Sequence, residues 1–349
     1  MVCVHVARPS VALKENRGLE PKSSRMFVRE QDRPANPPVD AASGTFQRIH
    51  ENLGLVVRGK PKVLQHLVVA LFAGGHCLME DVPGVGKTTL AKSLARSIRG
   101  DFKRVQFTPD LLPTDIVGTS VYNPKDVRFE FKEGPVFTNV LLADEINRAS
   151  PRTQSSLLEA MNEGQVTIDG RAMPLPSPFL VLATQNPIEY HGTYPLPEAQ
   201  LDRFAVRLEL GYPPVADELD ILERHHLGDP LERLEPVVSL EEIAVAQQVT
   251  RNVRVERPVA EYILALVHGT REDPRVKLGV STRGALALYR VAQALAVGRG
   301  RDFVLPDEVK EMALEVLSHR IVRDTKAKYS GVTKEQIIGE IIARTRVPV

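Results

Sequence analysis

The most constraining feature of this sequence is a short loop with two glycines, Asp81-Val-Pro-Gly-Val-Gly-Lys-Thr-Thr89. The loop follows an apolar run at 76–80 and precedes a helical pattern of apolar residues at 87–98. Glycine lets a backbone turn tightly because it has no Cβ. The N–H groups of such a loop and of the next helix N-terminus together bind anions. The strand–loop–helix order therefore predicts a phosphate-binding loop, and a turn capped by the lysine is the alternative.

The residue types in this loop suit a triphosphate with a divalent cation. Lys87 is long enough to reach the β- and γ-phosphates, and the hydroxyl of Thr88 is a ligand for Mg²⁺. Asp81 departs from the usual pattern, which has glycine six residues before the lysine. Since a carboxylate aimed at the triphosphate would repel it, we expect Asp81 to point away and to cap or pin the loop. The candidate cofactor-binding residues here are Val82, Pro83, Gly84, Val85, Gly86, Lys87, Thr88 and Thr89.

Two adjacent carboxylates follow a second apolar run, in the segment Leu141-Leu142-Ala143-Asp144-Glu145. The ends of such strands lie beside the phosphate loop in open α/β sheets. Because side chains alternate along a strand, the two acids require distinct roles. We expect Asp144 to hold Mg²⁺, mostly through water, and Glu145 to orient and polarise the attacking water. The solvated start of a loop is the alternative interpretation.

A third apolar run ends in Leu182-Ala183-Thr184-Gln185-Asn186-Pro187. An amide at this strand end is able to contact both the γ-phosphate and the attacking water, so Asn186 joins Lys87 and Glu145 as a candidate catalytic residue. Asn-Pro alone indicates only a turn. The assignment therefore depends on this run lying beside the phosphate loop in the sheet.

The wider pattern predicts an α/β fold with a parallel sheet between helices, followed by a small all-helical domain. Apolar runs alternate with helical segments up to Pro213, as in a parallel sheet covered on both faces. Helical patterns dominate after Pro214. Beyond the phosphate loop, the expected strands are 140–143, 179–183 and 205–210.

The first part of the chain has a different character. Residues 1–44 contain five prolines among charged and small residues, so we expect a flexible extension there, with Met26 as a possible alternative start. The expected divisions are 1–44 for the extension, 45–213 for the α/β nucleotide-binding domain and 214–349 for the helical domain.

Composition narrows the classes of function. The formal net charge of +1 provides no strong attraction to nucleic acid or to an anionic membrane. The chain has only two cysteines, Cys3 and Cys77, which form neither a disulfide framework nor a zinc-binding spacing and fit a reduced, cytoplasmic setting. No apolar stretch reaches the length of a membrane span, so membrane insertion is not expected.

Several longer segments resemble the MoxR family of AAA+ ATPases. They are Asp144-Glu145-Ile146-Asn147-Arg148-Ala149, Thr153-Gln154, Leu157-Leu158-Glu159-Ala160-Met161, Ala183-Thr184-Gln185-Asn186-Pro187 and Gly192-Thr193-Tyr194-Pro195-Leu196-Pro197-Glu198-Ala199-Gln200-Leu201-Asp202-Arg203-Phe204. The resemblance covers roughly 46–320 and implies a P-loop AAA+ core followed by a helical lid. It also implies ATP and Mg²⁺ as the cofactors.

The resemblance implies a homo-oligomeric ring, usually a hexamer, with sites between subunits. Arg203 matches an arginine finger, which enters the neighbouring subunit's site and offsets charge on the γ-phosphate. A structural salt bridge is the alternative role for Arg203, and Arg148 is a rival for the finger. Arg283 matches the second sensor, an arginine that binds the cofactor and reports its state to the lid. The family often has proline before this arginine, where this chain has Thr282.

The resemblance also implies interactions with other proteins. Segments 115–137 and 164–170 resemble inserted hairpins that face the pore of the ring or a client in related ATPases, and plain exposed hairpins are the alternative. Family members often act as chaperone-like factors with partners that carry von Willebrand factor A domains. Val57-Arg58-Gly59 lies where relatives contact adenine.

Three other functions remain open at this point. A nucleic-acid motor shares this core, but the near-neutral charge disfavours it. A chelatase-type subunit shares the helical insert, but the segment 192–200 favours the MoxR family. A nucleotide-gated scaffold without catalysis is disfavoured by the intact Lys87, Asp144, Glu145 and Asn186.

Overall fold

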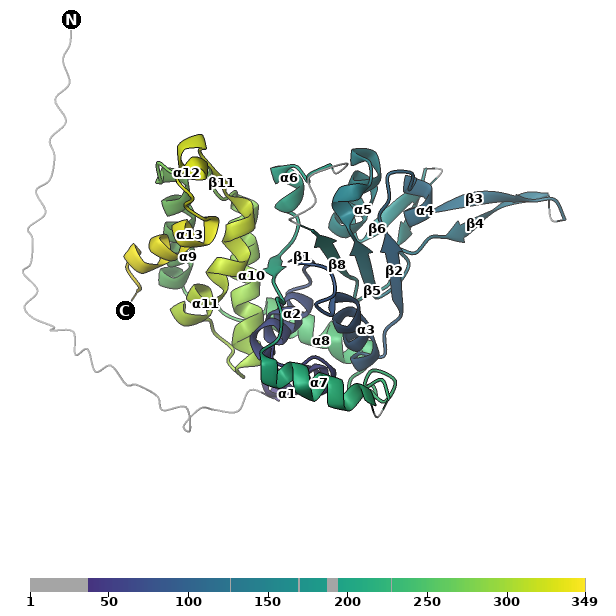
Figure 1. Cartoon of the computed structure of the whole chain (residues 1–349), viewed down its shortest axis with the longest axis horizontal. Coiled ribbons are helices and arrows are strands. Elements are labelled where there is room, and N and C mark those ends of the chain that lie inside the picture. The colour runs from purple at the N-terminus through teal and green to yellow at the C-terminus, as the bar shows by residue number, and fades with distance from the viewer. Residues whose placement is uncertain (1–36, 126, 169, 187–193, 227, 349) are drawn as a thin grey trace, which may run out of the picture. The chain divides into compact units, whose positions relative to one another are not determined.

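The computed structural model describes residues 37–125, 127–168, 170–186, 194–226 and 228–348 (Figure 1). The part of the expected extension before residue 37, with Cys3 and Met26, lies outside these ranges. Pro187, Gly192 and Thr193, which contribute to the family resemblance, also lie outside them. Among the described residues, no helix combines the length and the apolar character needed to cross a membrane.

The first described helix, α1 (Pro37–Val56), begins inside the segment expected to be an extension through residue 44. Proline is tolerated in the first turn of a helix, where the backbone N–H has no partner within the helix. The buried residues of α1 recur at spacings of three and four, which places them on one face; they are Val39, Ala42, Phe46, Ile49 and Leu53. The boundary at residue 44 is therefore too late, because this apolar face is easily overlooked in a proline-rich composition.

The core of the α/β part is a five-stranded sheet of order β2-β5-β8-β1-β9. All neighbouring strands are parallel. The strands are β1 (Cys77–Glu80), β2 (Phe102–Gln106), β5 (Val140–Asp144), β8 (Leu180–Gln185) and β9 (Val206–Leu208). The sheet confirms the predicted strands and adds β2, an edge strand that the apolar pattern did not reveal.

Both faces of this sheet are buried, which explains why its inner strands read as continuous apolar runs. Cys77 and Met79 of β1 face a core formed with α1, α2 (Pro61–Phe72) and α3 (Lys87–Ser97), whereas Leu78 faces a second core with α5 (Pro151–Glu163). Cys77 is fully buried, and this burial raises the pKa of its thiol well above the usual range. It is an inert core residue, as the sequence indicates.

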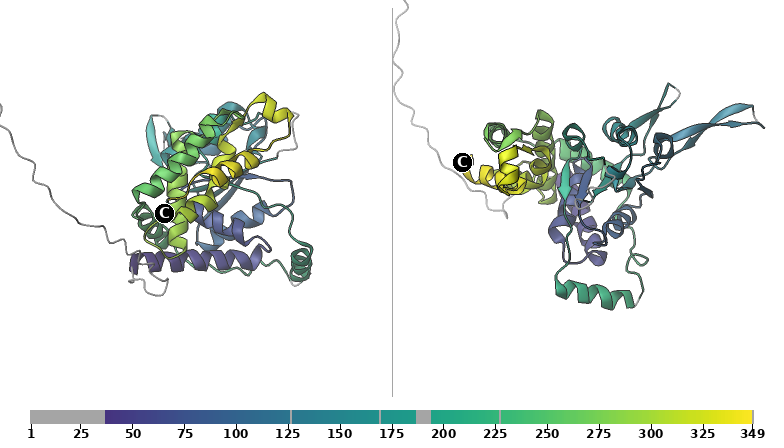
Figure 2. Two further views of the ribbon diagram at one scale, coloured as in Figure 1. Left: turned by 90° about the vertical axis from the view of Figure 1, so that its left-hand side faces the viewer. Right: turned by 45° about the horizontal axis from the view of Figure 1, so that its top comes forward.

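Two antiparallel hairpins extend the sheet domain. Strands β3 (Gly118–Asn123) and β4 (Arg128–Glu133) follow the short helix α4 (Pro113–Val117), and Figure 2 shows this hairpin projecting from the sheet. Strands β6 (Gln165–Ile168) and β7 (Arg171–Pro174) form the second hairpin. Both coincide with the inserted hairpins expected from the resemblance.

The remainder of the chain is mainly helical, as predicted. Its helices and short strands are α6 (Glu198–Leu201), α7 (Val215–His226), α8 (Leu240–Arg251), α9 (Arg257–Glu272), β10 (Val276–Leu278), α10 (Thr282–Gly298), α11 (Pro306–Leu317), β11 (Val322–Arg323), α12 (Thr325–Tyr329) and α13 (Lys334–Arg344). Two short 3-10 helices, η2 (Ile146–Arg148) and η3 (Ser318–Arg320), complete the described elements.

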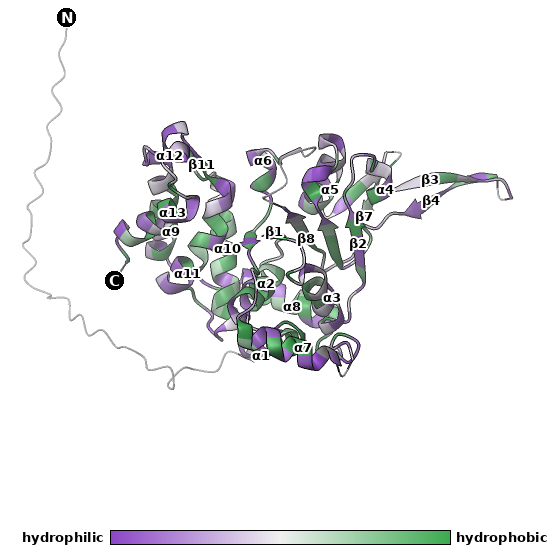
Figure 3. Ribbon diagram, viewed as in Figure 1, coloured by the Kyte–Doolittle hydropathy of each residue, from purple (hydrophilic) through white to green (hydrophobic). Residues whose placement is uncertain are grey.

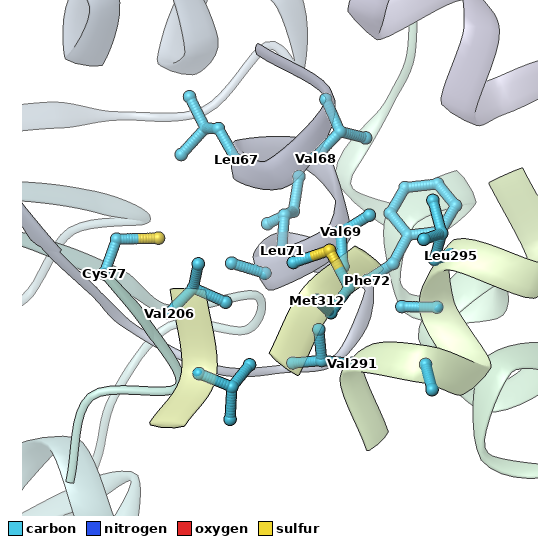
Figure 4. Packing of buried hydrophobic residues seen from close by; sticks show 14 of the residues in the cluster. Leu67, Val68, Val69, Leu71, Phe72, Cys77, Val206, Val291, Leu295 and Met312 are labelled. Atoms are coloured by element: carbon cyan, nitrogen blue, oxygen red, sulfur yellow. The ribbon is translucent and has the colours of Figure 1, made fainter. Parts of the chain in front are cut away.

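The C-terminal helices share one apolar core with a face of the sheet. Figure 4 shows Leu71 and Phe72 of α2 between Cys77 and Val206 of the sheet and Leu295 of α10. Figure 3 shows hydrophobic residues along α10 and the central strands, while the outer helices are mixed. Helix α10 is therefore anchored against α1 and α2, and this anchoring determines where its N-terminus lies.

Phe46 offers a test of this shared core. Its side chain is 2% exposed, and its ring meets that of Phe72 edge to face with centroids 5.3 Å apart. We expect Phe46→Ala to lower the free energy of unfolding by about 3–5 kcal/mol, because burial is lost and a cavity remains. Urea unfolding measures this change, and Leu55→Ala, at a position 55% exposed on the same helix, is the control. Equal, small effects of both substitutions would contradict the packing.

Candidate functional site

The loop between β1 and α3 has the conformation that phosphate binding requires. Gly84 and Gly86 have φ angles of 85° and 94°, in the region that favours glycine. Gly86 is also the N-cap residue of α3, so the free N–H groups of this helix N-terminus belong to the loop. Lys87 lies across the loop, and its Nζ donates to the carbonyl oxygen of Asp81 at 2.9 Å. The loop is thus formed and braced by its own lysine.

Asp81 points away from the anion cradle, as predicted. Its carboxylate is buried and accepts hydrogen bonds from the backbone N–H of Leu210 and, at 2.9 Å, of Gly211. These two residues follow β9, the strand beside β1. The aspartate that replaces the usual glycine therefore pins the start of the phosphate loop to the segment after β9.

The acid pair lies at the end of β5. The hydroxyl of Thr184 donates to Asp144 Oδ1 at 2.6 Å and accepts from the backbone N–H of Glu145 at 2.8 Å. Glu145 has a φ of 57°, which is uncommon for a residue with a Cβ. Its carboxylate accepts from Gln106 at 2.6 Å and from Arg148 at 3.0 Å.

Three residues of this network were missed by sequence reasoning: Arg104, Gln106 and Thr184. Arg104 pairs with Asp144 at 2.6 Å, and Gln106 holds Glu145. Both belong to β2, and the register of this strand aligns Gln106 with Asp144. The available signal is the alternation of Arg104 and Gln106 with the buried Val105. This alternation is difficult to recognise because the segment is short and contains charged residues.

A cavity of about 380 Å³ brings the sequence-predicted residues together. Its lining consists of Pro83, Gly84, Gly86, Lys87, Thr88, Arg104, Gln106, Asp144, Glu145, Thr184 and Asn186. A neighbouring cavity of about 570 Å³ shares Gly84 and Gly86 and is also lined by Val57, Arg58, Val85, Thr89 and Tyr212. Val82 lines neither. The first cavity has mainly polar side chains and suits phosphates, whereas the second has more apolar ones, with Arg58, Lys60 and Glu218 among its lining.

The donors in the first cavity fit a magnesium ion that is bound together with phosphates. Within the described ranges, no group of three or more histidine, cysteine or acidic residues forms a metal cage. The cavity instead offers one strand-end carboxylate, Asp144, and the hydroxyl of Thr88. Mg²⁺ typically uses one or two carboxylates and completes its shell with substrate phosphates and water.

Arg203 and Arg283 lie outside the lining of both cavities. Burial, and next the positive charge of Arg283, lower the pKa of Arg203. Arg283 donates to Asn162 Oδ1 at the end of α5. The arrangement does not support a cofactor contact of Arg283 within its own chain, because the packing of α10 on α1 and α2 carries its N-terminus toward α5.

The two candidate finger arginines have different surroundings. Arg148 pairs with Glu145 of its own chain at 3.0 Å. Within the described residues, the buried Nε of Arg203 has no hydrogen-bond partner. Arg203 follows α6 and retains donor capacity, whereas Arg148 already contributes to the acid network of its own subunit.

Comparisons with known proteins identify both parts of the fold. Residues 76–206 match the model described as "ATPase family associated with various cellular activities (AAA)", and residues 268–341 match the AAA lid domain. The crystal structure of a putative ATPase from Cytophaga hutchinsonii has a TM-score of 0.83 and 39% identity, covering 89% of this chain and 97% of that one.

Curated relatives extend the match over most of the chain. An uncharacterized protein of Bacillus subtilis, YeaC, is 51% identical over 86% of this chain and 93% of its own length. Chaperone MoxR1 of Mycobacterium tuberculosis is 39% identical over 87% of this chain and 82% of its own length. With a phosphate loop, an acid pair and a helical lid in the expected order, this chain belongs to the MoxR family of AAA+ ATPases.

Proposed function

We propose that this protein binds ATP with Mg²⁺ in the cavity beside the phosphate loop and hydrolyses it to ADP and phosphate. The observation that carries the proposal is the convergence of Lys87, Thr88, Asp144, Glu145 and Asn186 on one cavity. Each of these side chains has a separate task in phosphoryl transfer to water. A chain that only bound nucleotide would need the loop but not the acid pair.

Binding of the triphosphate uses the loop amides and Lys87. The triphosphate displaces Lys87 Nζ from the Asp81 carbonyl oxygen, and the ammonium then contacts the β- and γ-phosphates. Thr88 and Asp144 hold the Mg²⁺, which neutralises charge on the phosphate oxygens. Arg104, the ion-pair partner of Asp144, is half-exposed, so its guanidinium group is able to move toward solvent when the cation binds.

Glu145 orients the attacking water and accepts its proton. Its backbone is held by Thr184 and its carboxylate by Gln106, so the acid is fixed before the substrate arrives. Asn186 follows β8 at the same edge of the sheet and provides an amide for the γ-phosphate and the water. These contacts reduce the reorganisation needed in the transition state.

Arg203 completes the site of a neighbouring subunit in a homo-oligomeric ring, for which we propose six members. Its position outside both cavities of its own chain supports action in trans. The first turn of α10, which contains Arg283, is held next to Arg203 because its N-cap residue Ser281 donates to Asp202. Arg148 pairs with Glu145 in its own subunit, so we propose Arg203 and not Arg148 as the finger.

The helical lid and the projecting hairpin couple this cycle to a client protein. Tyr122 and Phe129 at the β3–β4 hairpin are 49% and 72% exposed, and their rings pack against each other. An exposed aromatic pair is typical of a contact with another protein. Because a curated relative is named a chaperone, we propose remodelling or maturation of a client. The family resemblance leads us to propose a protein with a von Willebrand factor A domain as a partner. A chelatase subunit is disfavoured because MoxR1 is 39% identical over 87% of this chain, whereas a magnesium-chelatase subunit homolog of Methanocaldococcus jannaschii is 28% identical over 53%. The near-neutral charge disfavours a nucleic-acid motor.

The hydrolytic role of Glu145 has a direct test. We expect Glu145→Gln to bind ATP with nearly unchanged affinity and to lower kcat at least about a hundredfold, because the proton acceptor is lost. Lys87→Ala is the matched control, and it should abolish ATP binding itself. Calorimetric titration with ATP and a phosphate-release assay distinguish the two defects. Wild-type turnover by Glu145→Gln would exclude the proposed catalytic role.

Mixed rings test the position of Arg203. Arg203→Ala subunits keep an intact cavity and lack the finger, whereas Lys87→Ala subunits keep the finger and lack the cavity. Each variant alone should be nearly inactive, and mixing them should restore part of the phosphate release because one complete interface forms. If the mixture stays as inactive as its components, although both variants form rings, Arg203 does not act in trans.

Substitution of Asp81 should weaken binding of the nucleoside part of ATP more than binding of its phosphates. Leu210 and Gly211, which its carboxylate pins, line the apolar cavity next to the loop. We expect Asp81→Ala to weaken ATP binding about tenfold, or ~1.4 kcal/mol, and to leave binding of inorganic triphosphate almost unchanged. Asp81→Asn, which keeps one acceptor oxygen, should lose less. Equal losses for ATP and triphosphate in competition titrations would show that Asp81 acts on the phosphate loop instead.

A further inference from the structure

Arg320, a buried arginine of η3, forms hydrogen bonds with the turn that carries Arg203. The side chain of Arg320 is 2% exposed, and its Nε donates to Asp202 Oδ1 at 2.9 Å. Its terminal nitrogens donate to the carbonyl oxygens of Asp202, Phe204 and Ala205. The acceptors thus lie on both sides of Arg203 in the chain.

The Asp202 carboxylate also accepts a hydrogen bond from the N-terminus of α10. The hydroxyl of Ser281 donates to Asp202 Oδ2 at 2.6 Å. As the N-cap residue of α10, Ser281 also accepts the backbone N–H of Gly284 at its Oγ, at 3.1 Å. Arg283 belongs to this capped turn. One carboxylate therefore joins three features: the turn that bears Arg203, the η3 arginine and the first turn of α10.

The packing around this junction is close. A Cβ built on Gly284 would approach Arg320 Cδ to 2.8 Å, so the first turn of α10 lies directly against the arginine stem. Burial lowers the pKa of Arg320 to about 10, and it remains protonated at neutral pH. A buried charge is costly unless it is paired and fully hydrogen-bonded. Most of the acceptors that compensate this cost belong to the turn at 202–205.

We propose that Arg320 is a positioning residue, which fastens the turn bearing Arg203 to the C-terminal helices so that Arg203 and Arg283 are presented to the neighbouring subunit as one unit. The inference rests on the proposed role of Arg203 in trans. Arg320 touches neither cavity and acts only through the turn it holds. Movement of the lid then moves the finger with it.

Arg320→Lys is the variant that separates this role from a general structural one. Lysine keeps the charge and a contact with Asp202, but one ammonium cannot bind the carboxylate and the flanking carbonyl oxygens together. We expect kcat per assembled ring to fall at least about tenfold, while the Kd for ATP changes less than threefold. Arg299→Lys is the matched control, because Arg299 pairs with the buried Glu308 of α11 and does not contact the turn. It should lower thermal stability and leave kcat per ring intact.

Mixed rings locate the defect within the subunit. Mixing with Lys87→Ala subunits, which supply a wild-type finger, should restore activity at the Arg320→Lys cavities. Mixing with Arg203→Ala subunits should restore none, because neither component donates a working finger. Restoration by neither partner, while Arg203→Ala is rescued by Lys87→Ala, would show a general structural defect and overturn the inference.

Other outcomes separate this inference from the function on which it rests. Restoration by both partners would show that the Arg320→Lys finger still works, which also overturns the inference. If Arg320→Lys does not assemble, Asp202→Asn tests the same junction, since the amide keeps the shape of the carboxylate and weakens both of its bonds. Unimpaired kcat in Asp202→Asn would contradict the proposal. Failure of Arg203→Ala itself to lose activity would instead reject the proposed function.

Discussion

The hydroxyl of Thr184 is the interaction on which the geometry of the site depends. It donates to Asp144 and accepts from the N–H of Glu145, so one side chain of β8 fixes both acids at the end of β5. The parallel register, which pairs Ala143 with Ala183, brings this hydroxyl to the acids. The bond also supports the left-handed backbone of Glu145, a conformation that costs about 1–3 kcal/mol. In this conformation the backbone leaves the strand at Glu145, and the Glu145 carboxylate points toward Gln106 and the cavity.

Features encoded within a few residues could be predicted from the sequence. The phosphate loop, the acid pair and the strand end at Asn186 each follow an apolar run, and the structure places all three on one cavity. The edge strand β2 could not be recognised, because only one of its five residues is buried. Arg104 and Gln106 were missed with it. Their contribution depends on register with β5, which is a property of the folded sheet and not of the local pattern.

Long-range packing explains the other differences. Helix α1 forms within the proline-rich segment because its apolar face is buried against α2, α3, α8 and α10, of which α8 and α10 are distant in sequence. The same packing anchors α10 along α1 and α2 and directs Arg283 toward Asn162 instead of the cofactor cavity. A motif identified Arg283 as functional but did not specify in which subunit it acts. That question depends on the position of a helix, which the surrounding core determines.

The junction at Asp202 suggests why the finger is connected to the lid and not only to the sheet. The lid shares its core with α1 and α2, while Arg207 of β9 pairs with Glu80, next to the phosphate loop, and with Glu335 of α13. A change at the loop therefore has a direct connection to the C-terminal helices. If those helices carry Arg203 through Asp202 and Arg320, the nucleotide state of one subunit alters the finger that it offers to the next. On our proposal, hydrolysis in such a ring is coupled between neighbours by a rigid connection within each chain, without any need for a flexible relay.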